Sequence, residues 1–109
     1  MAYDEELAER IRTLIGPGRD VVEKRMFGGL GFMVGGNLAI AASGQGGILV
    51  RADPDETDRL VEETPAEVAI MRGRPMTGWL RVAPEHLAGD SLGRFVASSV
   101  AYARSLPPK

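Results

Sequence analysis

The sequence contains no cysteine, and its 109 positions include one histidine, one tryptophan and five other aromatic residues. The absence of cysteine excludes disulfide scaffolds, thiolate metal centres, iron–sulfur clusters and thiol nucleophiles. His86 has neither a second imidazole for a metal site nor a serine in a Gly-x-Ser-x-Gly turn to activate. It follows Glu85 in a polar stretch, so we interpret it as a surface residue. We therefore expect no catalytic residue, no cofactor and no metal.

Long apolar runs are also missing, since no stretch approaches the ~18 residues that a membrane-spanning helix requires. The acidic start at Asp4-Glu5-Glu6 differs from the basic and then apolar start of a signal peptide. The net charge of −2 comes from 13 basic and 15 acidic residues. It gives the whole chain no preference for nucleic acid or for a membrane surface. We expect a cytoplasmic protein that has no membrane partner.

The composition is that of an ordinary globular protein, with 44% hydrophobic and 26% charged residues. A chain of this length can bury enough surface for one core without disulfides or metals. No repeat, low-complexity run or composition shift divides it. We therefore expect one domain over residues 1–109.

Three segments show the periodicity and end signals of helices. Asp4 is placed to cap the first, and Gly16-Pro17 to end it. Asp53-Pro54-Asp55-Glu56 is typical of a second helix start, and Asp90 is placed to cap a third. The expected core positions are Leu7, Ile11, Leu14 and Ile15 in the first helix, and Leu92, Phe95, Val96, Ser99 and Ala103 in the last.

Residues 21–51 alternate with the period of two that is typical of strands, and glycine-rich turns separate the runs. Gly28-Gly29 is either a bend or a turn, so this region holds three or four strands. Residues 68–71 and 78–82 predict two more strands. We expect an α+β fold with an antiparallel sheet and flanking helices, in the order α-β(3)-α-β(2)-α.

Two patterns imitate ligand-binding motifs but fail in detail. Gly29-Leu30-Gly31 would need a further glycine where Val34 stands, and no Walker lysine motif occurs, so we interpret the 14 glycines as turn residues. Asp53-x-Asp55 resembles the start of a calcium loop, but the later ligands and the loop glycine are absent. Helix capping explains these acids without a metal.

Basic and aromatic residues supply the most distinctive local chemistry. Lys24 and Arg25 lie on opposite faces of a predicted strand, and three arginines surround Trp79 in the sequence. Arginine beside an aromatic ring suits phosphate pairing, base stacking or a protein contact. The alternative is a stabilising stack of Arg81 on Trp79 at the wet sheet face. The candidate interaction surface consists of Lys24, Arg25, Phe27, Arg72, Arg74, Trp79 and Arg81.

Small residues line the middle of the predicted sheet, at Gly31, Ala39, Ala41 and Ala42. A sheet face this smooth is covered either by a helix or by a second copy of the chain. The second alternative predicts a homodimer.

The run from Lys24 through Arg25-Met26-Phe27-Gly28-Gly29 to Val34, followed by Gly36-Asn37, resembles the N-terminal domain of the TfoX/Sxy competence regulators. Residues 73–79 and the closing residues 103–109 resemble the same family. The resemblance covers the whole chain and implies an α+β domain of secretion-chaperone-like architecture. It supplies no catalytic residues. The signature marks either a binding surface or a fold requirement, namely a bent strand with a tight glycine pair.

Full-length regulators of this family carry a second domain and act on DNA-uptake genes together with the cyclic-AMP receptor protein. The resemblance thus implies a stand-alone, non-enzymatic regulatory module whose partner belongs to the transcription machinery. One alternative is direct nucleic-acid binding through Arg72, Arg74 and Arg81 around Trp79, which the negative net charge disfavours. Another is a small ligand-binding protein or an enzyme with an unrecognised pocket, using carboxylates, Tyr3 or Tyr102.

Overall fold

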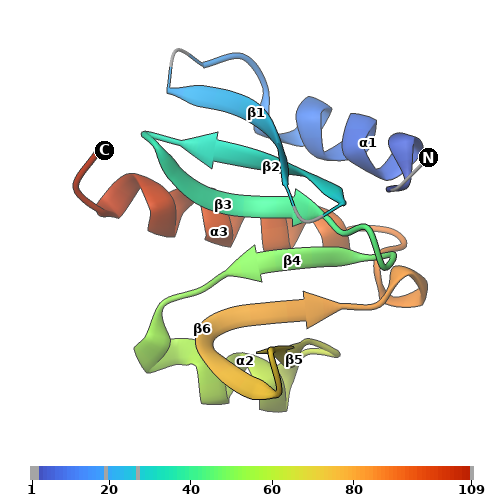
Figure 1. Cartoon of the computed structure of the whole chain (residues 1–109), viewed down its shortest axis with the longest axis vertical. Helices are drawn as coiled ribbons and strands as arrows, with labels where there is room; N and C mark the ends of the chain where they lie inside the picture. The colour runs from blue at the N-terminus through green and yellow to red at the C-terminus, as the bar shows by residue number, and fades with distance from the viewer. Residues whose placement is uncertain (1–2, 19, 27, 109) are drawn as a thin grey trace.

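Six antiparallel strands form one sheet in the order β1-β2-β3-β4-β6-β5, and three α-helices accompany it (Figure 1). This computed structural model describes residues 3–18, 20–26 and 28–108, and the counts refer to them. The α+β class is confirmed. The elements are α1 (Glu5–Ile15), β1 (Val21–Met26), β2 (Gly29–Val34), β3 (Asn37–Ala42), β4 (Ile48–Arg51), α2 (Thr57–Glu63), β5 (Glu67–Met71), β6 (Arg74–Val82) and α3 (Ser91–Ser105), with 3-10 turns at Pro54–Glu56 and Pro84–His86.

Four strands, rather than three, precede α2, so the expected order α-β(3)-α-β(2)-α is wrong in this count. Gly28 has a φ of 74°, the left-handed conformation that a tight chain reversal requires. Met26 and Gly29 face each other in the register, so β1 and β2 form a hairpin. Gly28-Gly29 is thus part of a turn and not a bend within one strand. The last strand begins at Arg74, four positions before the predicted Gly78.

The ends of α1 follow the sequence signals. The Asp4 carboxylate accepts a hydrogen bond from the Leu7 backbone N–H at 3.1 Å, and Gly16 ends the helix with a φ of 73°. Leu14, expected in the core, is 50% exposed, and its side chain lies near Gly93 of α3, which has no side chain to cover it. Asp90 holds the predicted N-cap position of α3, but its side chain forms no capping hydrogen bond.

The core lies between the sheet and the long helices α1 and α3, which lie behind the sheet in Figure 1. All five predicted core positions of α3 are buried. Ala39 and Ala42 belong to this core as well, so a helix of the same chain covers these small residues. Self-association stays a prediction. Among the described residues, no helix is both long enough and apolar enough to cross a lipid bilayer.

Candidate functional site

The face of the sheet opposite α1 and α3, called here the open sheet face, is turned toward the viewer in Figure 1. Gly31 points to this face, because its neighbours Leu30 and Phe32 point into the core. A Cβ atom at Gly31 would lie 2.9 Å from the side chains of both Leu38 and Met26. These two side chains therefore cover the open sheet face at its β1–β3 end.

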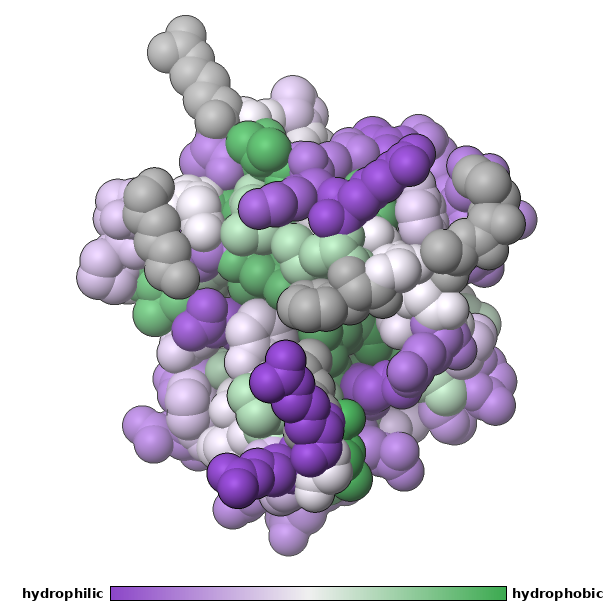
Figure 2. Space-filling model, viewed as in Figure 1, coloured by the Kyte–Doolittle hydropathy of each residue, from purple (hydrophilic) through white to green (hydrophobic). Residues whose placement is uncertain are grey.

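Leu49 continues this apolar surface toward β6. It lies between the buried Ile48 and Val50 of β4, and in the register it faces Ala41 on one side and Arg81 on the other. Alternation along β4 thus places Leu49 on the open sheet face, next to a cation. Figure 2 shows apolar side chains in the middle of this face, between long hydrophilic ones.

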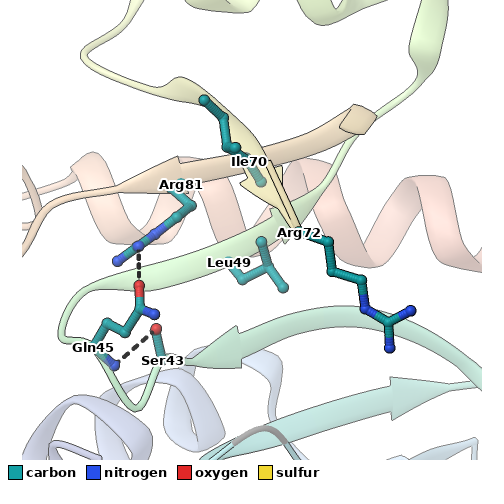
Figure 3. Close-up of a pocket in the computed structure, with 7 residues that line it drawn as sticks. Ser43, Gln45, Leu49, Ile70, Arg72 and Arg81 are labelled. Atoms are coloured by element: carbon teal, nitrogen blue, oxygen red, sulfur yellow. Dashed lines mark hydrogen bonds between the residues drawn. The ribbon is translucent and has the colours of Figure 1, made fainter. Parts of the chain in front are cut away.

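A hollow of about 390 Å³ opens over Leu49, between the β5–β6 hairpin and the turn that joins β3 to β4 (Figure 3). We call it the Leu49 hollow, and its lining residues are Ser43, Gln45, Leu49, Ala69, Ile70, Arg72 and Arg81. A smaller hollow of about 40 Å³ shares Ser43 and Leu49 with it and extends toward Met26. The sheet face is therefore grooved rather than flat.

The Leu49 hollow has an apolar middle and a cation on either side. Leu49 occupies the middle (Figure 3), and Ile70 of β5, which is 66% exposed, also lines the hollow. Arg81 reaches to one side, where its guanidinium donates to Gln45 Oε1 and, at 3.3 Å, to the Gly46 carbonyl. Arg72 extends to the other side, away from Arg81 (Figure 3). This arrangement suits a partner that combines an apolar group with negative charge.

Three arginines of the helices form ion pairs, whereas the cations of the sheet form none in the described part of the chain. Arg12 of α1, Arg59 of α2 and Arg104 of α3 each form ion pairs with carboxylates. The Arg104 hydrogen bond holds the pKa of Asp20 below its ordinary value. Among the described residues, no ion pair includes the sheet cations, which are Lys24, Arg72, Arg74 and Arg81. Their charge is therefore available to a partner.

Trp79 lies apart from the arginines that we expected around it. The Arg51 guanidinium carbon is 5.2 Å from the centroid of the Trp79 ring and 5.8 Å from that of the Tyr102 ring. The predicted stack of Arg81 on Trp79 is thus wrong, because Arg51 faces Trp79 in the register and Arg81 is held by Gln45. No local sequence signal pairs Arg51 with Trp79, since they come from non-consecutive strands.

The remaining members of the candidate surface are separated. Lys24 faces Gly31 and Arg25 faces Leu30 in the register, so their predicted placement on opposite sides of β1 is confirmed. Lys24 belongs to the open sheet face, whereas Arg25 lies on the side of the helices. Arg74 is exposed at the start of β6. Phe27 lies outside the described residues.

His86 is exposed in the 3-10 turn after β6, and it lines a separate hollow of about 430 Å³ together with Glu67 and Arg81. Glu67 faces Arg81 in the register, but the two form none of the described ion pairs. Within residues 3–18, 20–26 and 28–108, no three histidine, aspartate or glutamate side chains lie close enough together to hold a metal ion.

Comparison with known protein families matches residues 13–103 to the TfoX N-terminal domain. The chain belongs to this family. The TfoX N-terminal domain accounts for all three helices in part or whole and for every strand, and the α+β structure fits it. Membership points to a regulatory module. No curated protein and no solved structure gives a significant match to the chain.

Proposed function

We propose that this TfoX N-terminal domain is a non-enzymatic regulatory module that binds a protein of the transcription machinery through its open sheet face. The observation that carries the proposal is the uncovered apolar surface around Leu49, bordered by the unpaired cations Arg72 and Arg81. Hollows that combine an apolar floor with a few polar or charged groups at the edge are typical of binding sites. The proposal includes a cytoplasmic location for the protein.

A protein partner fits the Leu49 hollow better than a nucleic acid. Proteins that bind single strands stack bases on aromatic rings, whereas the described lining of this hollow consists of aliphatic and polar side chains. The single tryptophan of the chain, Trp79, forms a cation–π contact with Arg51. Apolar contact area bordered by arginine is typical of protein interfaces.

The test compares two variants with the same change in charge in pull-downs from the protein's own cells after nuclease treatment. The first variant combines Ile70→Glu with Arg72→Glu in the Leu49 hollow. The control combines Val61→Glu with Arg94→Glu, which are exposed on α2 and α3. We expect a transcription protein that wild type and control retain and the first variant loses, and that binds again as a purified protein. Identical captured sets from both variants would contradict the proposal.

Direct nucleic-acid binding is the second candidate, because Lys24, Arg72, Arg74 and Arg81 of the sheet take part in no ion pair among the described residues. It predicts an affinity for labelled DNA or RNA that falls steeply between about 50 and 200 mM salt. Binding that changes little over this range, or that the Arg72→Glu change leaves intact, would exclude it.

A further inference from the structure

We infer that the Leu49 hollow binds a short, curved segment of a partner protein in which one apolar side chain is flanked on both sides by carboxylates. The inference rests on the proposed function and specifies the chemistry of the partner. Three features of the hollow lead to it: its size, the position of its two arginines, and the backbone of Arg72.

The middle of the hollow is built for an apolar side chain. Leu49 forms its floor, and Ala69 and Ile70 of β5 are also among the lining residues. A volume of about 390 Å³ is within the range of small ligand pockets and far below that of a folded domain. It therefore accommodates a short segment of chain that inserts a side chain over Leu49.

Arg81 provides a fixed anion contact at one side of this position. Its guanidinium donates to Gln45 Oε1 and to the Gly46 carbonyl, and the Gln45 backbone N–H in turn donates to Ser43 Oγ at 3.1 Å. A guanidinium has five N–H donors, so donors remain for a carboxylate. Because the side chain is already held, binding an anion orders little that was free before.

Arg72 provides the second cation on the opposite side of Leu49 (Figure 3). It has a φ of 53°, whereas the left-handed region favours glycine and asparagine. The neighbouring Gly73 also has a positive φ, of 76°, so the two form a tight hairpin turn in which arginine is an unfavourable choice. Backbone strain that a protein retains at one residue indicates that the side chain there has a function. The function we assign to Arg72 is to place a positive charge at the edge of the hollow.

The two arginines point away from each other, so a single anion cannot contact both. Both arginines can pair with an anion only if the ligand has a carboxylate on each side of its apolar group. Successive side chains of an extended chain alternate in direction, so a curved or turning segment brings three neighbours to one surface. The occupant is therefore an acidic, apolar, acidic stretch of polypeptide and not a free phosphate or a small carboxylic acid.

The test is a titration of the isotopically labelled full chain with blocked peptides, followed by amide chemical shifts. The first peptide has a leucine between two glutamates, the second replaces the leucine with serine, and the third replaces both glutamates with lysine. We expect the first to give saturable shifts at residues 43–49, 69–72 and 81. We expect the second to bind at least about tenfold more weakly, and the third not to bind.

Single variants identify the residues responsible. Arg72→Asn and Arg81→Gln should each weaken the first peptide about tenfold, whereas Arg94→Gln on α3 removes the same charge and should leave binding unchanged. Arg72→Asn is suited to the turn, so its loss of binding cannot arise from unfolding. A lack of saturable shifts at millimolar peptide, or equal shifts with all three peptides, would overturn the inference.

The two proposals fail in different ways. If the peptide does not bind but Ile70→Glu with Arg72→Glu still abolishes capture of a transcription protein, the proposed function stands and the acidic segment is wrong. If that variant captures the same proteins as wild type, the proposed function itself fails.

Discussion

Arg72 is the one residue other than glycine that has a positive φ among the described residues, at 53°. Its neighbour Gly73 has the same sign, which is the pattern of a type I′ hairpin turn. Asparagine followed by glycine is the favoured sequence there. We expect Arg72→Asn to raise the free energy of unfolding by about 0.5–1 kcal/mol, because it relieves backbone strain without adding the flexibility of glycine. Urea denaturation measures the change.

Gly73→Ala provides the opposite change in the same turn. A Cβ atom at Gly73 would meet nothing within 4 Å, so the substitution adds only backbone strain at a φ of 76°. We expect a loss of about 1 kcal/mol in the free energy of unfolding. If both substitutions in this turn leave the stability unchanged, the turn does not have the geometry described above.

At the scale of elements, the two glycines of the Arg25-Met26-Phe27-Gly28-Gly29 signature serve different needs of the β1–β2 hairpin. A Cβ at Gly28 would meet nothing within 4 Å, but its φ is 74°. A Cβ at Gly29 would lie 2.2 Å from the Ala42 carbonyl oxygen, so β3 leaves no room for a side chain. The glycine pair is therefore a requirement of the fold, whatever the flanking cations bind.

This difference predicts that substitutions at the two glycines lower the free energy of unfolding by different amounts. We expect Gly28→Ala to lower the free energy of unfolding by about 1 kcal/mol through strain alone. Gly29→Ala should cost about 2–3 kcal/mol, because the clash is with backbone and the β2–β3 pairing has to shift. Denaturation curves of both variants measure the ranking, and equal losses would show that the close approach of β3 is not maintained in solution.

The contact between α1 and the edge strand β1 depends on pH. Arg12 donates to Glu23 at 2.5 and 2.6 Å and holds the pKa of Glu23 below its ordinary 4.5. Stabilisation by this lowered pKa is complete above pH 4.5 and is lost as the pH falls through the folded-state pKa. Since both side chains are partly exposed, we expect the pair to contribute less than about 1 kcal/mol.

Glu23→Gln tests this contact through the pH dependence of the melting temperature. The variant should be less stable than wild type near pH 7, and the difference should shrink below pH 4.5 as wild-type Glu23 takes up a proton. High salt should shrink it too, because exposed ion pairs are screened. A difference that stays constant from pH 7 to pH 2 would show that packing, and not charge, is responsible.

Local patterns in the sequence predicted the helices and strands, whereas the pairing of strands that are distant in the sequence determined which residues form the candidate site. Asp4 and Gly16 defined α1, and the strand predicted over residues 78–82 lies within β6. The register of β4 with β6 could not be predicted, because 27 residues separate Arg51 from its partner Trp79 and nothing in either strand specifies the other. That register placed Arg51 on Trp79 and Leu49 beside Arg81, and thereby created the hollow.

At the scale of the whole molecule, the negative net charge conceals an uneven distribution. Twelve acidic residues precede Pro65, and most of them belong to α1, α2 or the segments at their ends. Carboxylates of this group pair with Arg59 through Glu56, with Arg12 through Glu23 of β1, and with Arg104 through Asp20. The open sheet face keeps unpaired arginines around an apolar middle. The net charge of −2 therefore says little about what this face attracts.

One core connects all parts of the chain, which predicts that it unfolds in a single transition. The core includes Ile11 of α1, Phe32 of β2, Leu80 of β6 and Leu92 of α3. Trp79 is a natural probe, because its environment combines Arg51 of β4 with Tyr102 of α3 through their shared cation contact. We expect its fluorescence and the far-ultraviolet circular dichroism to change at the same urea concentration.

The Arg51→Met variant is the control for this measurement, since it removes the cation from Trp79 while keeping apolar bulk between the rings. It should shift both transitions together and by the same amount, because a cation–π contact contributes about 0.5–1 kcal/mol to one cooperative unit. A fluorescence transition that precedes the loss of circular dichroism, in wild type or variant, would show that β5, β6 and α2 unfold separately from the rest. The single-domain expectation would then be wrong, and the Leu49 hollow would lie between two independently stable parts.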